Sequence, residues 1–208
     1  MKKMSGIILA VAACAMLLGA ADTPETQIIT PDGLKQMLAN PGTEPVGARK
    51  PDVVIVEYYD YNCPYCKNLV PALQGVLAQD PKVAVVYKDW PILSAVSKYA
   101  AVSALAAGYQ GKFLAAHDAL IGGPRLAQNA QVDAILQRAG VNLDTLNKDR
   151  TAHAQEIAAL LARNDQEAHA LTLQGTPGLV VGRQLVFGIV DLGQLQQLVA
   201  ISRQGKDK

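Results

Sequence analysis

Cys63-Pro64-Tyr65-Cys66, which closely follows the apolar run Val53-Val54-Ile55-Val56, is the stretch that decides the fold of this chain. The apolar run predicts a strand that is buried on both faces of a parallel or mixed sheet. Pro64 suits the first position of a helix, because it has no N–H to leave unpaired and its φ is close to the helical value. Cys63 then lies at the helix start, where unpaired backbone N–H groups and the helix dipole favour a thiolate. The two intervening residues bring Cys66 round almost one turn, within reach of a disulfide with Cys63.

A strand that leads into a Cys-x-x-Cys helix is typical of the redox dithiol in thioredoxin-like folds. We expect Cys63 to be the attacking sulfur and Cys66 to be the buried sulfur that resolves a mixed disulfide. A zinc half-site and an inert structural disulfide are the alternatives. Zinc generally takes four ligands, and the chain has neither a second cysteine pair nor closely spaced histidines among His117, His153 and His169. We therefore expect no metal and no bound cofactor, with the Cys63–Cys66 disulfide itself as the redox group.

The first 21 residues have the pattern of a secretory signal peptide. Lys2 and Lys3 precede the apolar span Ile7–Leu18, and the small residues Gly19–Ala21 follow it. The apolar span is shorter than the about 20 residues that cross a bilayer, which favours cleavage over a retained anchor. A retained anchor and lipidation at Cys14 are the alternatives to cleavage after residue 21.

Removal of this segment changes both the cysteine count and the charge. Cys14, Lys2 and Lys3 are lost, so that two cysteines and 17 basic against 18 acidic residues remain. A chain whose only cysteines form the Cys-x-x-Cys pair is no disulfide-stapled scaffold, which favours a protein that acts on the thiols of other proteins in an oxidising compartment. The near-neutral charge gives no support to nucleic-acid binding, and we expect none. The export signal, with no retention sequence at Lys206-Asp207-Lys208, predicts a periplasmic location.

The rest of the chain divides into four segments. Residues 22–52 are interrupted by prolines and predict an N-terminal arm, and residues 53–91 predict the first part of a thioredoxin-like domain with the dithiol. Residues 92–173 are Ala-rich with helical periodicity and predict an insertion of four or five helices. Residues 174–208 predict the second part of the thioredoxin-like domain. The predicted fold class is therefore α/β, a thioredoxin-like mixed sheet with an inserted all-helical subdomain.

Within these segments the hydrophobic pattern and the turn residues predict individual elements. Strands are expected over Val53–Tyr59, Val83–Lys88, Gly178–Val181 and Gln184–Ile189, and helices over Asp32–Asn40, Pro64–Gln79 and from Asp191 to about Arg203. The first two strands and the helix between them form a right-handed βαβ unit.

Three motifs in this order carry a family resemblance: Glu57-Tyr58-Tyr59-Asp60-Tyr61-Asn62-Cys63-Pro64-Tyr65-Cys66-Lys67, Tyr87-Lys88-Asp89-Trp90-Pro91-Ile92-Leu93 and Gly175-Thr176-Pro177-Gly178. Together with the export signal and the helical insertion, they resemble the DsbA-like family of bacterial periplasmic thiol:disulfide oxidoreductases, roughly from residue 46 to residue 203. The resemblance implies an enzyme that exchanges disulfides with cysteine-containing exported proteins. It also implies a membrane redox partner that resets the dithiol.

The resemblance assigns roles to residues beyond the dithiol. Thr176-Pro177 occupies the family's cis-proline loop, which faces the dithiol and pairs with an extended substrate chain. Glu57 matches the family's buried acidic residue; burial raises its pKa and lets it exchange a proton with Cys66 through water. Lys88, one strand over, is the expected partner of Glu57. From the residues alone, an ordinary turn, an exposed carboxylate and a surface lysine are the alternatives.

Four tyrosines lie close to the dithiol in sequence. Strand alternation predicts that Tyr58 and Tyr59 pack in the core, and we expect Tyr61 and Tyr65 to form an apolar, substrate-facing rim. The strongest oxidases of the family carry His at the position of Tyr65. A Pro-Tyr pair lacks that donor, so we expect a less depressed pKa for the attacking cysteine and a less oxidising disulfide.

The direction of exchange follows less directly from the sequence. We expect oxidation of substrate thiols, because no separate dimerisation domain precedes the fold, whereas isomerases are often dimeric. Thr176 before the proline resembles the isomerase-type branch, and a disulfide isomerase or reductase is the first alternative. The second alternative is a module in which Cys63 and Cys66 bind Cu(I), an ion that two soft thiolates suit. A surface protein with a vestigial site is the third.

Overall fold

The computed structural model of the chain describes residue 24 and residues 26–39 and 43–204. The predicted signal segment, with Cys14, lies outside these residues. Across the described ranges, each helix is either too short or too polar to pass through a bilayer.

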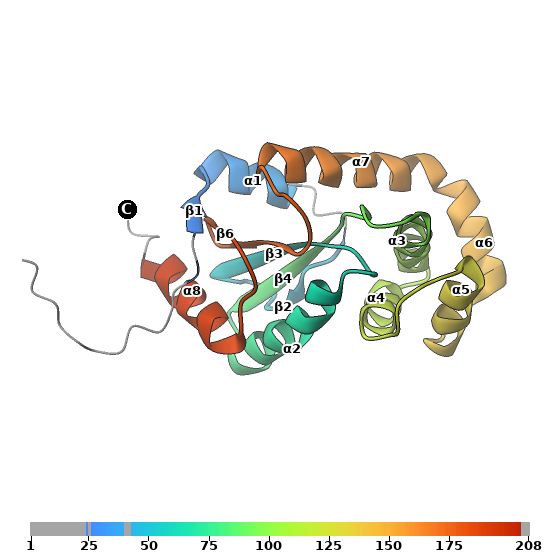
Figure 1. Ribbon diagram of the computed structural model, residues 1–208, viewed down its shortest axis with the longest axis horizontal. Helices are drawn as coiled ribbons and strands as arrows, with labels where there is room; N and C mark the ends of the chain where they lie inside the picture. Colours follow the sequence, from blue (N-terminus) through green and yellow to red (C-terminus); the bar gives the residue numbers. More distant parts are fainter. Residues whose placement is uncertain (1–23, 25, 40–42, 205–208) are drawn as a thin grey trace, which may run out of the picture.

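A six-stranded mixed sheet forms the centre of the molecule, in the order β1-β6-β5-β3-β4-β2 (Figure 1). Among the strands of the described residues, β3 and β4 run parallel and every other neighbouring pair is antiparallel. Nearly every residue of β3 and β4 is buried, which explains the continuous apolar run from which β3 was predicted. The strands are β1 (Thr26–Ile28), β2 (Val46–Gly47), β3 (Val53–Tyr59), β4 (Val83–Asp89), β5 (Gly178–Val181) and β6 (Gln184–Val186).

Helices cover both faces of the sheet, and a block of further helices lies beside it (Figure 1). α2 and α8 pack together on one face, α1 and the C-terminal part of α7 lie on the other, and α3 to α6 form the block. The helices are α1 (Pro31–Ala39), α2 (Pro64–Gln79), α3 (Ala95–Gly108), α4 (Phe113–Ile121), α5 (Asn129–Arg138), α6 (Leu143–Ala152), α7 (Ala154–Ala170) and α8 (Leu192–Gln204). The predicted fold class, a thioredoxin-like mixed sheet with a helical insertion, is confirmed.

The structure departs from the predicted elements at the sheet edges. β1 and β2 were not predicted, because two or three residues are too few to show an alternating pattern. β6 ends at Val186, three residues before the predicted end, and Gly188 soon follows with a φ of 90°, a conformation that glycine adopts without strain. Asp191 caps α8 as predicted, since its Oδ1 accepts a hydrogen bond of 2.8 Å from the Gln194 N–H.

The two faces of β3 belong to two different cores. Tyr59 packs into the large core shared by α2, α8 and the helical block, whereas Tyr58 packs beneath α1 and α7. Both tyrosines are at most 1% exposed, in agreement with their predicted core positions. Because successive side chains of a strand point to opposite faces, a single residue decides on which side of the sheet a group lies.

Lys88 illustrates this rule, because it lies on the face opposite Glu57. In the parallel register Glu57 is paired with Tyr87, and Tyr58 with Lys88. The buried ammonium of Lys88 donates a hydrogen bond to Glu167 of α7, whose same carboxylate oxygen accepts a hydrogen bond from the Tyr58 hydroxyl. The prediction that Lys88 is the partner of Glu57 is therefore wrong by one position in the register.

Replacing Lys88 should show that it stabilises the α7 side of the sheet. Lys88→Met leaves Glu167 without its cation, and Glu167 keeps only 19% of its side chain exposed, so we expect a loss of about 2 to 3 kcal/mol in the free energy of unfolding. Urea titration at neutral pH measures this loss. Lys35→Met, on the exposed surface of α1, is the matched control. Equal stability of the two variants would contradict the ion pair's role.

Candidate active site

The dithiol lies where β3 ends and α2 begins. After Tyr59 a short turn leads to Cys63, which is the N-cap residue of α2 with an extended backbone conformation. Asp60 holds the turn: its Oδ1 accepts a 2.7 Å hydrogen bond from the Asn62 N–H, and its Oδ2 accepts a 2.9 Å bond from the Leu93 N–H. The Cys63 N–H donates to the Asp60 carbonyl at 2.9 Å. The first sulfur is thus placed by the backbone of a rigid turn.

Cys63 is the more acidic of the two thiols, which are both free in the structure. The hydrogen bond from the Cys66 thiol is the main cause, and together with the backbone N–H groups of Cys66 and Tyr65 it lowers the pKa of Cys63 from 9.0 to about 6, against the opposing effect of burial. The Cys66 N–H lies 3.4 Å from the Cys63 sulfur. The Thr176 carbonyl accepts the proton of the neutral thiol at 3.1 Å, an interaction that ionisation removes.

Cys66 is held in the opposite state. Its side chain is fully buried, and burial raises its pKa far above the ordinary value; the hydrogen bond to Cys63 and the charge of Glu57 raise it further. At neutral pH the dithiol therefore consists of a thiolate at Cys63 and a thiol at Cys66. This division gives the pair one nucleophile and one sulfur that ionises only when a proton acceptor takes its proton.

Glu57 is a buried carboxylate on β3 that interacts electrostatically with both sulfurs. It is 3% exposed, and burial raises its pKa from 4.5 to about 8, with a further contribution from the charge of Cys63. Its charge also raises the pKa of Cys66, which places the carboxylate and that sulfur in electrostatic contact. At neutral pH Glu57 therefore carries a proton while Cys63 carries none. In this protonated state Glu57 can supply a proton to the Cys66 sulfur, and after ionisation it can accept one from it.

The loop before β5 faces the dithiol from the other side. The Thr176–Pro177 peptide bond is cis, as the resemblance implied, and Thr176 touches the Cys63 sulfur through its carbonyl. The next residue, Gly178, pairs with Tyr58 in the antiparallel register of β5 and β3. The register thereby anchors the loop at the same end of the sheet as Cys63.

Tyr61 and Tyr65, predicted to form one rim, occupy different environments. Tyr65 is 53% exposed, at the surface of the first turn of α2. Tyr61 is 1% exposed, and its hydroxyl forms hydrogen bonds with the Tyr59 hydroxyl at 3.0 Å and with His117 Nδ1 at 3.4 Å. The prediction that Tyr61 faces the substrate is therefore wrong, because its hydroxyl forms hydrogen bonds with Tyr59 and His117 in the interior.

His117 and Asp89 are buried polar residues near the site to which the sequence assigned no role. His117 of α4 packs against Tyr87 with ring centroids 4.1 Å apart, and burial lowers its pKa to about 3, so that it stays neutral. Asp89 ends β4, and burial raises its pKa to about 8. Neither carboxylate oxygen of Asp89 has a hydrogen-bond partner in the described part of the chain. An isolated histidine in a helix gives no sequence signal for this position, whereas Asp89 was visible inside the second motif.

Several large apolar side chains are exposed in the segments that follow the ends of β4, β6 and the dithiol turn. Leu93 is 52% exposed beside the Asp60 turn, and Ile92 precedes it. Phe187 and Ile189 follow the end of β6 and are 38% and 57% exposed. Tyr65 and Leu93 thus offer exposed apolar side chains on α2 and beside the turn that holds Cys63, whose own side chain is only 3% exposed.

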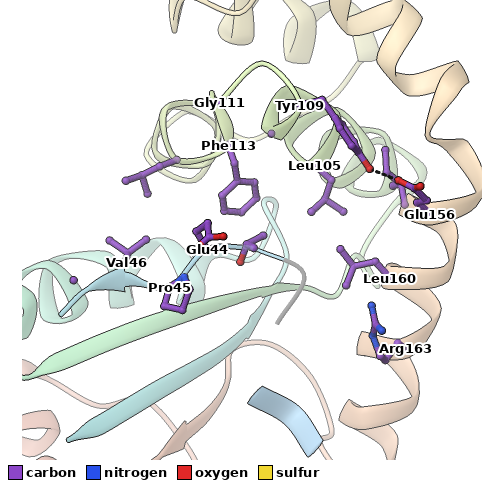
Figure 2. A pocket seen from close by; sticks show the side chains of 15 residues that line it. Glu44, Pro45, Val46, Leu105, Tyr109, Gly111, Phe113, Glu156, Leu160 and Arg163 are labelled. Carbon is purple, nitrogen blue, oxygen red and sulfur yellow. Dashed lines mark hydrogen bonds between the residues drawn. The ribbon is translucent and has the colours of Figure 1, made fainter. Parts of the chain in front are cut away.

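A separate pocket of about 850 Å³ opens between β2, the α3–α4 connection and α7 (Figure 2). Apolar side chains such as Leu105 and Phe113 line it, and Tyr109 donates a hydrogen bond to Glu156 at one end. None of the dithiol, Glu57 or cis-proline residues contributes to its wall. The pocket is therefore not part of the thiol site.

Comparison with known proteins gives this arrangement a family. The model of the DSBA-like thioredoxin domain matches residues 54–200, which include the dithiol, the helical insertion and the cis-proline loop. A thioredoxin-like oxidoreductase from Silicibacter pomeroyi DSS-3 shares 38% of its sequence with the chain at a TM-score of 0.78; the match covers 85% of this chain and 99% of that one. A periplasmic thioredoxin-like protein from Salmonella enterica serovar Typhimurium is 26% identical at a TM-score of 0.72, covering 86% of this chain and 99% of that one.

Curated relatives by sequence are longer proteins. The Na(+)/H(+) antiporter NhaA 1 of Salinispora arenicola (strain CNS-205) is 27% identical over 164 residues, which cover 76% of this chain and 24% of the antiporter. The chain thus spans about a quarter of the length of that relative, and the similarity concerns one segment of it.

The pH dependence of alkylation should report the lowered pKa of Cys63. In the reduced protein the reaction rate should fall as the pH drops through about 6, because the reactive thiolate is lost there. The same chain in denaturant is the control, with a midpoint near the ordinary value of a free cysteine. Cys66→Ala removes the thiol that lowers this pKa most and should move the midpoint upward. A midpoint in the folded protein equal to that in denaturant would contradict the site's electrostatics.

Replacement of Glu57 should reveal the cost of its burial. A carboxyl with a folded pKa of about 8 against 4.5 destabilises the fold increasingly as the pH rises between these values, by up to about 5 kcal/mol at the upper end. Glu57→Gln should therefore match the wild type in stability at acidic pH and exceed it in alkaline solution. Urea titrations of the reduced proteins across this range test the prediction. A difference that does not change with pH would refute it.

Proposed function

Since the chain belongs to the family of DSBA-like thioredoxin domains, we propose that it is a periplasmic thiol:disulfide oxidoreductase that exchanges disulfides with cysteine-containing exported proteins. The observation that carries this proposal is the unequal acidity of the two sulfurs, with the pKa of Cys63 lowered to about 6 and that of Cys66 raised. Such a pair combines a stable thiolate with a second sulfur that remains protonated. No bound cofactor is needed, because the Cys63–Cys66 disulfide carries the two electrons.

In the oxidising direction, a substrate thiolate attacks the Cys63 sulfur of the protein disulfide. The bond between Cys63 and Cys66 breaks, a mixed disulfide forms at Cys63, and Cys66 leaves with the electron pair and takes a proton from Glu57. A second substrate thiolate then attacks the substrate sulfur of the mixed disulfide and releases Cys63 as a thiolate. The substrate loses two electrons and gains a disulfide, and the protein becomes the dithiol.

The geometry supports a role in the exchange for the groups around Cys63. The Thr176 backbone lies beside the sulfur and can pair with an extended substrate segment, while Pro177 has no N–H to compete there. Tyr65, exposed next to Cys63, can pack on apolar substrate side chains. Glu57 lies under the site with a proton to give at neutral pH. In this scheme Thr176 and Tyr65 bind the substrate at the surface, and Glu57 transfers the proton in the interior.

The pKa of Cys63 favours oxidation as the direction. A low thiolate pKa stabilises the reduced form and makes Cys63 a good leaving group, which makes the disulfide more oxidising. The value of about 6 lies between those of thioredoxin, about 7, and of DsbA, about 3.5. This agrees with the expected effect of a Pro-Tyr pair. A membrane redox partner that accepts the two electrons would return the dithiol to its disulfide.

Redox titration against glutathione, combined with oxidative refolding of a reduced substrate protein, tests the function. We expect a midpoint less negative than the about −270 mV of thioredoxin, and formation of substrate disulfides by the oxidised protein. Cys63→Ala should abolish both. Cys66→Ala, mixed with a substrate that contains a disulfide, should accumulate the mixed disulfide, because Cys63 attacks the substrate disulfide, one substrate sulfur leaves as a thiolate, and no second cysteine resolves the product. A midpoint equal to that of thioredoxin would instead indicate a reductase or isomerase. A Cys66→Ala variant that traps no substrate would refute the proposal.

A further inference from the structure

Two side chains that bracket the dithiol in sequence hold the same segment of the helical insertion. Asn62 directly precedes Cys63, and Lys67 directly follows Cys66. Both contact residues 120–126, which form the end of α4 and the connection to α5. The dithiol is therefore fixed from both ends to a part of the chain about 60 positions away.

Lys67 closes the carboxyl end of α4. Its Nζ donates hydrogen bonds to the carbonyls of Leu120 at 3.1 Å, Ile121 at 2.9 Å and Gly123 at 2.9 Å. Three acceptors match the three N–H donors of an ammonium group, so the side chain is bound in its charged form. Lys67 is partly buried. Its three acceptors are backbone carbonyls, so a change of side chain at those positions does not remove them.

Asn62 grips the same segment through its side-chain amide. Its Oδ1 accepts a 2.7 Å hydrogen bond from the Leu126 N–H, and its Nδ2 donates a 3.0 Å bond to the Leu126 carbonyl. The Nδ2 group also donates to the Ser94 hydroxyl at the start of α3, at 3.3 Å. Asn62 thus fixes the position of the segment, but it brings no charge.

The charge of Lys67 acts on both ends of this contact. The last carbonyls of α4 carry the negative end of a helix dipole, and they face the start of α2, where the thiolate forms. Burial lowers the pKa of Lys67, and negative charge on Cys66, Asp60 or Cys63 opposes this lowering. The interaction is mutual, so the ammonium favours the thiolate, and it shields that thiolate from the α4 carbonyls.

We propose that Lys67 is a positioning residue of the thiol site, which seats the helical insertion against α2 and places one positive charge between the carboxyl end of α4 and the two sulfurs. This inference rests on the proposed thiol chemistry and extends it, because it makes the insertion part of the electrostatic environment of the dithiol. Asn62 contributes position alone, and Lys67 contributes position and charge.

Three variants of Lys67 separate the effect of its charge from the effect of its hydrogen bonds to the carbonyls of residues 120–123. Lys67→Gln keeps amide donors for the carbonyls and removes the charge, Lys67→Met removes both, and Lys67→Arg keeps both. The ultraviolet absorbance of the thiolate in the reduced protein gives the pKa of Cys63 in each. We expect a rise of about one unit for the Gln and Met variants and a value close to wild type for Arg. The equilibrium with glutathione at neutral pH should shift about fivefold toward the protein disulfide in the first two.

Two further variants serve as controls. Lys98→Met removes one exposed positive charge from α3 and should leave the pKa of Cys63 unchanged. Asn62→Ala loosens the segment without changing any charge, so it should accelerate hydrogen exchange at Leu126 and raise the pKa of Cys63 less than Lys67→Gln does. The proposal is overturned if Lys67→Gln leaves the pKa of Cys63 at its wild-type value, or if Asn62→Ala raises it equally. These readouts need no protein substrate, so a failure of the proposed function would be seen separately.

Discussion

The unequal solvation of two sulfurs one helical turn apart is the constraint on which the site depends. Cys63 lies at the edge of the first turn of α2, where hydrogen-bond donors converge, and Cys66 lies inside the core against β3. Burial raises the pKa of both thiols, and the hydrogen bonds that Cys63 receives, first of all from the Cys66 thiol, make the first one acidic. The sheet and α2 therefore serve to hold one sulfur at the surface of the core and the other within it.

The alternation of β3 and β4 distributes buried charge between the two faces of the sheet. Glu57 lies on the side of the sheet that α2 covers. It keeps its proton at neutral pH, because burial raises its pKa and the negative charge of Cys63 raises it further. Lys88, only one register step away, meets Glu167 on the other face and forms an ion pair there. The sheet thus separates a protonated carboxyl group from a cation that would favour its ionised form. A Lys88 ammonium beside Glu57 would lower the pKa of that carboxyl and remove its proton.

Local sequence patterns predicted the parts of the fold that local physics determines. The apolar run of β3, the N-terminal proline of α2 and the glycine breaks of the insertion each act within a few residues, and the structure has these elements at or near the predicted positions. The errors at Lys88 and Tyr61 have another origin. Lys88 depends on a strand register between chain segments 30 residues apart, and Tyr61 depends on the partners Tyr59 and His117. The contacts of Asn62 and Lys67 with residues 120–126 likewise follow only from tertiary packing.

The helical insertion changes the environment of the dithiol without supplying a sulfur or an acid to it. His117 and the carbonyls at the end of α4 come from the insertion, and they meet Tyr61 and Lys67 on either side of the Cys-x-x-Cys turn. A thioredoxin-like domain without this block would leave the Lys67 ammonium in water, where its effect on a nearby thiolate is weakened by the high dielectric. The same lysine, held by three carbonyls in a partly buried position, interacts electrostatically with Cys63 in a medium of lower dielectric. The acidity of Cys63 is in this respect a property of the packing between the two parts of the chain as well as of the four-residue motif.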